Sequence, residues 1–460
     1  MGTIPRYMYL NISIPNNFIE ERTYTISTLI RDLLGLPYEL SIHENPSTEI
    51  SFNKKNIIIV DSFFNKYAST KNYLHENNLP KSIKKIPNPF KFTENLISIY
   101  GDGPILIEDH KITCNLDIIA STFFMLTRWE EYVLNEKDQF SRFNDLKSCA
   151  YKFNFYERPI VNEYIECIWK MLKKLEFPKE RKQTKFSIFH SHDIDHLNYW
   201  SSPWKFLKSS IKYTFFNKNI PFVVKSLKEY PLSFFNPKKD PYYTYDYLMN
   251  KSEELNTKSH FYFMSGGITK YDSKYSITTL YAKKIFKNIK KRGHIIGFHP
   301  SFNTYNNQHL FNKELSHLQS IIKEPVEYGR QHYLRFEVPT TWQIWEDNNL
   351  KQSSSCGYPL LFGFRLGICL PFHPFNILTK QKLSLLEKPL LVMDATLTTA
   401  LHQKKMLSKS FEKIDTVLNQ VKKYNGTFSL LWHNGNLFLP EWYSSIKSYE
   451  NLLTKCKEYS

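Results

Sequence analysis

The chain has 460 residues, of which 42% are hydrophobic and 16% aromatic, so it can bury a large core and is not intrinsically disordered. This length leaves room for two domains, or for one barrel with an extension. The formal net charge of +17 permits an anionic partner, but the lysines are scattered and no nucleic-acid-binding motif accompanies them, so we expect no nucleic acid partner.

Cysteine usage and hydropathy indicate a cytoplasmic protein. Six cysteines fall at irregular spacings without a Cys-x-x-Cys pair, which argues against a disulfide framework and favours buried free thiols in a reducing compartment. Residues Met1–Met8 lack a basic segment followed by an apolar one, so we expect no secretory signal. No apolar run approaches about 18 residues, so we expect no stable membrane insertion.

Residues 1–100 alternate short apolar runs with polar turns, and helical stretches follow, so residues 1–180 are expected to form a small accessory α/β domain. The expected strands are Tyr7–Ile14, Tyr38–Ile42, Ile57–Asp61 and Leu96–Tyr100, and the expected helices are Thr25–Leu34, Asp117–Tyr132 and Asn162–Leu175. The segment Phe177–Thr184 is charged and contains a proline, and we interpret it as the domain boundary.

From residue 185 to residue 460 the pattern becomes regular, with strand-like runs separated by helical ones. The expected strands are Phe186–His192, Ser259–Met264, His294–His299, Val326–Phe336, Phe362–Arg365, Leu390–Asp394 and Thr427–His433. The expected helices are Thr278–Lys291, Leu310–Ile322, Ser408–Lys423 and a last one from Glu441. This alternation predicts parallel βαβ units and a barrel. The insert at residues 198–245 is expected to lie over the mouth of that barrel.

Polar side chains recur where the predicted strands end. Asp193 and Asp195 are two residues apart, so in extended chain they point to the same side. Their mutual repulsion is relieved when one binds a cation and the other accepts a proton. His299, Arg330, His332, Asp394 and His433 follow later strands. In α/β barrels the carboxyl edge of the strands is where active sites are built, so these residues are candidates for one site.

The series Asp193-Ile-Asp195, Gly-His-Ile-Ile-Gly-Phe-His over 293–299, an Arg-containing strand, and Leu-Trp-His over 431–433 resembles the polysaccharide deacetylase family, also described as the NodB-like domain or carbohydrate esterase family 4. The similarity covers roughly residues 185–440. Residues 105–180 resemble the region that precedes this domain in a bacterial subgroup linked to surface-polysaccharide clusters.

The resemblance implies a distorted (β/α) barrel that uses one divalent metal ion, with zinc expected. The implied activity is the removal of acetyl groups from an N-acetylated or O-acetylated sugar, either a glycan or its precursor, in surface polysaccharide biosynthesis. Carried over residue by residue, Asp193 is the catalytic base, Asp195 and His299 are metal ligands, Arg330 or Arg335 orients the base, and His433 is the general acid.

Two positions depart from the family pattern. Asn303 stands where the second histidine ligand is expected, and asparagine binds zinc poorly. Either His192, His190 or His196 completes the site, or a harder metal or a water does, or the affinity for metal is weak. Ser353 stands near the place of an acidic residue that pairs with the active-site arginine, and Asp394 is a candidate substitute. Expected substrate-binding residues are His332, Arg365 and Asp394.

Three function classes follow. The first is the metal-dependent deacetylase. The second is a catalytically degenerate relative that binds glycan without turnover, which Asn303 and Ser353 favour and for which aromatics such as Trp200 and Tyr242 would supply stacking surfaces. The third, a basic protein that binds nucleic acid or a membrane surface, rests on charge alone, and an even spread of lysines over the fold would dismiss it.

Overall fold

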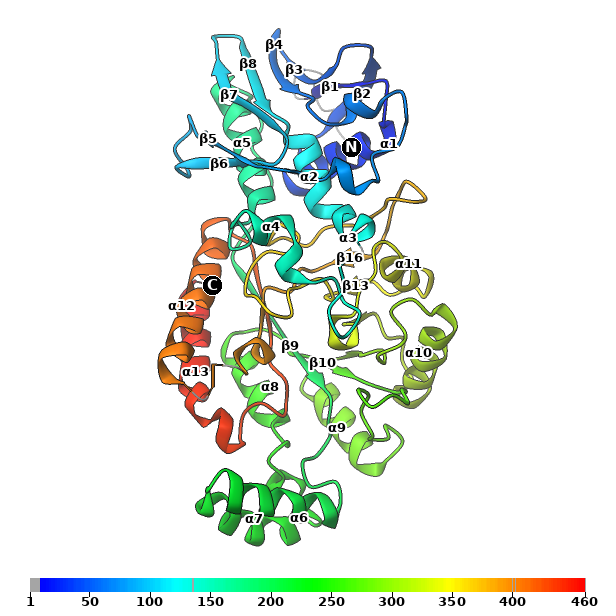
Figure 1. The fold of residues 1–460 in the computed structure, drawn as a ribbon, viewed down its shortest axis with the longest axis vertical. Coiled ribbons are helices and arrows are strands. Elements are labelled where there is room, and N and C mark those ends of the chain that lie inside the picture. Colours follow the sequence, from blue (N-terminus) through cyan, green and yellow to red (C-terminus); the bar gives the residue numbers. More distant parts are fainter. Residues whose placement is uncertain (1–8, 135, 399, 402, 460) are drawn as a thin grey trace. The chain divides into compact units, whose positions relative to one another are not determined.

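A computed structural model describes residues 9–134, 136–398, 400–401 and 403–459 (Figure 1). The predicted absence of a secretory signal concerns Met1–Met8, which lie outside the described residues. Internal contacts divide the chain into two compact units. The first comprises residues 1–185, 336–346 and 363–389, and the second comprises residues 186–335, 347–362 and 390–460. Within the described residues, no helix combines the length and the apolar character needed to cross a bilayer.

The first unit is built on a six-stranded mixed sheet in the order β2-β1-β3-β4-β8-β7. Its strands are β1 (Leu10–Pro15), β2 (Tyr38–His43), β3 (Ser47–Phe52), β4 (Lys55–Val60), β7 (Gly101–Ile107) and β8 (Lys111–Leu116). A hairpin of β5 (Lys84–Pro87) and β6 (Asn95–Ser98) and the helices α1 (Ile19–Ile26), α2 (Ile118–Thr127), α3 (Trp129–Val133), α4 (Cys149–Lys152), α5 (Ile160–Lys174) and α11 (Thr340–Asp347) complete it. Asn53 and Lys54 turn the β3–β4 hairpin with positive φ angles.

Two later segments that the sequence assigns to the 185–460 domain belong to the first unit. Aromatic packing and a hydrogen bond hold the segment 363–389: the rings of Phe123 and Phe375 lie 5.6 Å apart, and the Tyr24 hydroxyl donates to the carbonyl of His373. The predicted strand Phe362–Arg365 is wrong. Gly363 adopts a φ of 152°, and the amide of Phe364 donates to the carbonyl of Tyr156, so this stretch is irregular.

The second unit is a parallel sheet with helices between its strands, which confirms the predicted α/β class. Its strands run in the order β13-β12-β11-β10-β9-β18-β17, and each neighbouring pair is parallel. The strands are β9 (Ser187–Ile194), β10 (His260–Phe263), β11 (Ile295–Phe298), β12 (Tyr328–Gly329), β13 (Gln352–Ser353), β17 (Val392–Met393) and β18 (Thr427–Leu431). The order has two ends, so in the described chain this sheet is an open barrel.

The helices of the second unit are α8 (Tyr245–Glu254), α9 (Leu280–Lys291), α10 (Gln308–Ile322), α12 (Lys404–Lys423) and α13 (Tyr443–Tyr459). α9 shows how they form: Thr279 caps its first turn, and Ile285, Phe286 and Ile289 are buried while its lysines point outward. The predicted strand Val326–Phe336 is wrong beyond Gly329. Tyr333 and Leu334 have φ angles of 59° and 52°, which turn the chain sharply.

The insert after β9 folds as two helices, α6 (Pro203–Ile211) and α7 (Ile220–Ser233), joined by a π-helical turn, Lys212–Phe216. Their inner sides pack through aromatic rings, with Phe206 stacked on Tyr230 at 4.1 Å between centroids and Tyr213 at 4.5 Å from Phe222. Figure 1 shows α6 and α7 together as one layer, in green. Asp240 fixes the base of the insert by accepting the backbone N–H groups of Tyr199, Trp200 and Tyr242.

Candidate metal centre

The carboxyl ends of the parallel strands bring seven polar side chains of the second unit together. Asp193 closes β9 and Asp195 follows it, His299 follows β11, Arg330 and His332 follow β12, Asp394 follows β17, and His433 follows β18. Because parallel strands end at the same edge of a sheet, side chains far apart in the sequence meet there.

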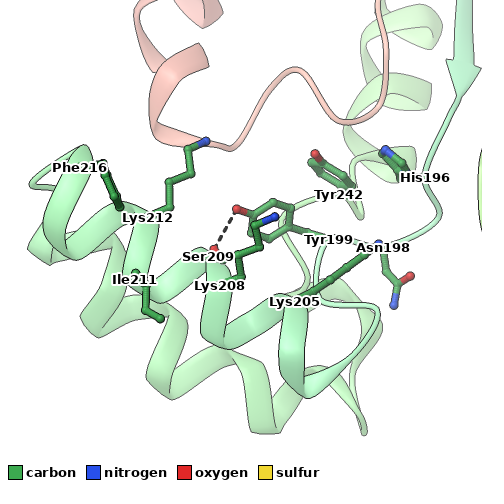
Figure 2. A pocket seen from close by; sticks show the side chains of 10 residues that line it. All are labelled: His196, Asn198, Tyr199, Lys205, Lys208, Ser209, Ile211, Lys212, Phe216 and Tyr242. Atoms are coloured by element: carbon green, nitrogen blue, oxygen red, sulfur yellow. Dashed lines mark hydrogen bonds between the residues drawn. The ribbon is translucent and has the colours of Figure 1, made fainter. Parts of the chain in front are cut away.

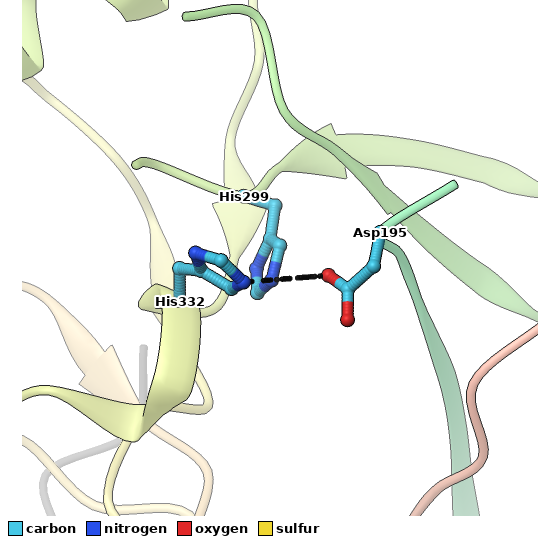
Figure 3. A group of neighbouring side chains, drawn as sticks. All are labelled: Asp195, His299 and His332. Atoms are coloured by element: carbon cyan, nitrogen blue, oxygen red, sulfur yellow. Dashed lines mark ion pairs between the residues drawn. The ribbon is translucent and has the colours of Figure 1, made fainter. Parts of the chain in front are cut away.

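Asp195, His299 and His332 form the centre of this group (Figure 3). Asp195 Oδ1 lies 3.5 Å from His299 Nε2 and 3.5 Å from His332 Nε2, and the three ligand atoms lie within 4.8 Å of one another. Asp195 Oδ1 and His299 Nε2 are buried without a hydrogen-bond partner. Buried polar atoms are normally satisfied, so these two atoms, which face each other, have the arrangement expected of ligands to a cation.

The ring of His299 is oriented by the backbone. Its Nδ1 lies 2.7 Å from the carbonyl oxygen of Arg330, which can only accept, so Nδ1 carries the proton and Nε2 presents a lone pair. Burial alone would lower the pKa of His299, but the carboxylates of Asp193 and Asp195 outweigh it and raise that pKa above its ordinary value. A cation between these groups would take the place of that extra proton.

His332 comes from the 3-10 turn His332–Leu334, directly after β12. Its Nδ1 lies 3.6 Å from Asp272 Oδ1, a carboxylate in the loop after β10, and its Nε2 faces Asp195. Burial lowers the pKa of His332 in spite of Asp272 and Asp195, which favours the neutral ring that a metal requires. A carboxylate behind a ligating imidazole is a common way to fix its orientation.

Asp193 lies beside this centre and is held by Arg330. Arg330 Nη1 donates to Asp193 Oδ1 at 2.8 Å, and Asp193 Oδ2 lies 3.8 Å from His299 Nε2. The guanidinium is fully buried and also donates to the carbonyl and hydroxyl of Ser354 and to the hydroxyl of Ser191. Serine and backbone oxygens therefore position Arg330. The acidic residue that the deacetylase pattern has near Ser353 is not needed for this purpose.

His433 and Asp394 form a pair on another side of the centre. Asp394 accepts from the backbone N–H of His433 and lies 2.6 Å from its Nδ1, while Asn436 donates to the same carboxylate. His433 Nε2 is thereby turned towards Asp195 Oδ2, at 3.8 Å. Burial would lower the pKa of His433, but Asp394 outweighs it and raises this pKa to about 10.

The structure does not bring the histidines of β9 to this centre. His192 Nδ1 donates to the carbonyl of Trp432 at 2.7 Å, and its Nε2 lies 3.1 Å from the hydroxyl of Ser259. The two ring nitrogens of His190 lie 2.8 Å from Ser252 and 2.7 Å from Tyr449. Both residues therefore use their nitrogens inside the protein core.

Three other residues from the sequence-based site also lie elsewhere. Asn303 is exposed, and its Oδ1 accepts a hydrogen bond from Arg335 at 3.1 Å. Arg335 further donates to the carbonyl of Phe302 and lies over the ring of Tyr305. Arg365 belongs to the first unit, where it forms a two-point ion pair with Glu131.

Sequence reasoning missed Asp272 and expected His332 to bind substrate. Asp272 lies in a loop closed by Gly266 and Gly267, where an acidic residue looks like an ordinary turn former. His332 follows Arg330 by two residues, and the sequence predicts a strand where the structure has the 3-10 turn that directs His332 to the centre. The polar residues at the end of the predicted strand were the only sign in the sequence that His332 belongs to the metal centre.

One carboxylate and two imidazoles fit a divalent transition metal. Catalytic zinc sites use three protein ligands of these types and leave a fourth position open. Two ligand atoms at about 2.1 Å from a metal in tetrahedral geometry lie about 3.4 Å apart. This value is close to the 3.5 Å that separates Asp195 Oδ1 from the Nε2 atom of each histidine. The donor set and its spacing therefore suit zinc, and carboxylate with imidazole also suits iron or cobalt.

Comparison with known proteins gives three results. Residues 10–178 match the model of a family of unknown function (DUF7033). No curated protein matches the chain. Among solved structures, the chain is similar to a "putative polysaccharide deacetylase" from Mycobacterium smegmatis, at 12% identity and a TM-score of 0.37 over 60% of this chain and 85% of that one. It is also similar to a "putative polysaccharide deacetylase involved in O-antigen biosynthesis" from Bordetella bronchiseptica, at 12% identity and a TM-score of 0.28 over 59% and 83%.

Proposed function

We propose that this protein is a metal-dependent hydrolase that removes acetyl groups from an N-acetylated or O-acetylated sugar in surface polysaccharide biosynthesis. The observation that carries the proposal is the set of unsatisfied ligand atoms on Asp195 and His299, with His332 beside them. Asp193 on Arg330 and His433 on Asp394 flank that set. The proposed metal is zinc, and the proposed donors are Asp195, His299 and His332.

A bound metal would lower the pKa of a water and polarise the acyl oxygen. The remaining chemistry belongs to side chains that flank the proposed ligands. Asp193, acting as general base, would take a proton from water, and Arg330 keeps this carboxylate in place. His433 would give a proton to the departing amine or alcohol from Nε2, because Asp394 occupies its Nδ1. Base and acid thus approach the centre from different strands, β9 and β18.

The proposed compartment rests on the state of the cysteines. All six cysteines are buried and free, which supports the proposal that the protein works in the reducing cytoplasm. The proposed substrate is an acetylated sugar precursor or a nascent glycan.

The test combines metal analysis with acetate release from N-acetylhexosamine-containing glycans. We expect about one equivalent of metal per chain and acetate release that stops on chelation and returns with zinc. Asp195→Asn keeps the size of the side chain and removes its charge, and it should lose both metal and activity while melting like the native protein. Full metal binding without acetate release would instead identify a glycan-binding protein without turnover. A metal-free native protein with no activity would overturn the proposal.

A further inference from the structure

The insert hairpin, residues 203–235, exposes an unusual amount of apolar surface. Eleven of the 24 large hydrophobic side chains that are exposed among the described residues fall within it. Trp204 is 71% exposed, Phe215 is 70% exposed and Phe235 is 90% exposed. A soluble domain rarely leaves so many aromatic side chains together in water, so this surface calls for a partner.

The exposed residues follow the helical repeat. On α6 and its continuation Trp204, Leu207, Ile211 and Phe215 are spaced by three and four, and on α7 Ile220, Val224 and Leu227 repeat the pattern. The two helices already use their other sides for each other, through Phe206 on Tyr230 and Tyr213 on Phe222. The outer stripes are therefore additional apolar faces, beyond those that fold the hairpin.

Positive charge flanks these stripes. Residues 203–239 contain eight lysines and one acidic residue, Glu229. Lys205, Lys208 and Lys212 follow one another along α6 at spacings of three and four, beside its apolar stripe, and Lys225 and Lys228 do the same on α7. A short helix with tryptophan and phenylalanine on one side and lysines beside them has the composition of a segment that lies in the interface of a membrane.

We propose that the insert hairpin docks this protein on the surface of an anionic lipid bilayer. The aromatic and aliphatic stripes would enter the boundary between headgroups and acyl chains, and the lysines would meet the negative headgroups. A second copy of the chain is a poorer occupant, because a two-fold contact would place the lysine-rich surface against itself. The helices have nine and 14 residues, which is too short to span a bilayer, so they would lie in its interface.

The hairpin also lines a cavity of about 560 Å³ (Figure 2). Lys205, Lys208 and Lys212 line one side of it, and His196 and Tyr242, whose rings are stacked, line the other. His196 directly follows Asp195 in the chain. Resting on the proposed function, the lysine-lined cavity beside His196 favours an acetylated sugar carried by a membrane lipid, whose anionic linkage would lie against these lysines.

The first experiment measures binding of the full chain to vesicles by co-sedimentation. We expect binding to phosphatidylcholine vesicles that contain about one third phosphatidylglycerol, weak binding to phosphatidylcholine alone, and release of most of the protein at about 1 M salt. The triple variant Trp204→Ser/Phe215→Ser/Phe235→Ser should bind the anionic vesicles about a hundredfold less tightly. No binding by the native protein, or equal binding by the triple variant, would overturn the proposal.

Two controls make the result specific. The variant Ile268→Ser/Leu280→Ser/Met406→Ser removes exposed apolar side chains elsewhere in the same unit and should bind vesicles like the native protein. Asp195→Asn should also bind normally, so a failure of the metal chemistry leaves the membrane result readable. Light scattering could instead show that the native protein is a dimer and the triple variant a monomer. If neither protein then binds vesicles, a second copy covers this surface and the membrane proposal is wrong.

Discussion

Two pairs of histidines in the second unit show how burial and hydrogen bonding separate structural from functional side chains. His190 and His192 on β9 are fully buried, and each ring places both nitrogens near a protein oxygen. His299 is equally buried, but its Nε2 has no hydrogen-bond partner, and His332 turns its Nε2 towards the same Asp195. Burial alone does not distinguish the pairs, whereas an unsatisfied nitrogen that faces a carboxylate does.

The sharpest test of this contrast compares His332→Ala with Asn303→Ala. We expect His332→Ala to lose bound metal and at least about a thousandfold in acetate release, because a ligand that supports several kcal/mol of transition-state stabilisation is gone. Asn303→Ala should keep its metal and most of its activity, since Asn303 contacts Arg335 outside the centre. Metal analysis and acetate assays on both variants check this. Equal losses in the two variants would mean that Asn303, which stands at the position of the second histidine in the deacetylase pattern, supports the metal as much as His332 does.

The core pair should respond in stability instead. His192→Ala removes the side-chain donor to the carbonyl of Trp432 and one of the partners of the Ser259 hydroxyl, and it opens a cavity, so we expect a loss of about 2–4 kcal/mol in the free energy of unfolding. Urea unfolding measures that loss, and metal content per folded chain should stay at the native level. The milder His192→Gln serves where the alanine variant does not fold. A variant of His192 that is stable but metal-free would contradict the division.

A smaller effect on metal affinity is expected from Asp272, which contacts the proposed ligand His332. Asp272→Asn removes the negative charge beside His332 Nδ1, so metal affinity should fall by about ten- to a hundredfold while the site remains assembled. Competition with a chromophoric chelator measures it. Glu253→Gln is the matched control, because Glu253 lies 3.1 Å from His294, a histidine outside the centre. Similar losses in both variants would point to a general effect of charge.

The smallest expected effect is a pH dependence of stability. Burial, helped by His294, lowers the pKa of His190 to about 3, while in the unfolded chain it is about 6.5. Below pH 6.5 the unfolded state therefore binds the proton first, and stability that is complete above that pH declines by up to about 1.4 kcal/mol per pH unit. Urea unfolding at pH 6.5 and 5.5 measures the slope. The slope corresponds to the number of protons taken up on unfolding, and His190→Gln should reduce that number by about one. An unchanged slope would contradict a lowered pKa of His190 in the folded protein.

Much of the second unit could be predicted because strand ends are visible in the sequence. Apolar runs that stop at Asp193, His299 and His433 place these residues on one edge as soon as the strands are parallel. The position of His332 depends on the left-handed backbone of Tyr333 and Leu334, which sequence periodicity does not show. Arg365 was misplaced for another reason, since its segment returns to the first unit through long-range packing.

The return of residues 336–346 and 363–389 to the first unit has a consequence for synthesis on the ribosome. The family match ends at residue 178, and a chain released at that point would already contain the six-stranded sheet. Yet the unit still lacks Phe375 beside Phe123 and the carbonyl that receives the Tyr24 hydroxyl. The packing of this unit is therefore completed only after residue 389 has left the exit tunnel, although all strands of its six-stranded sheet emerge much earlier.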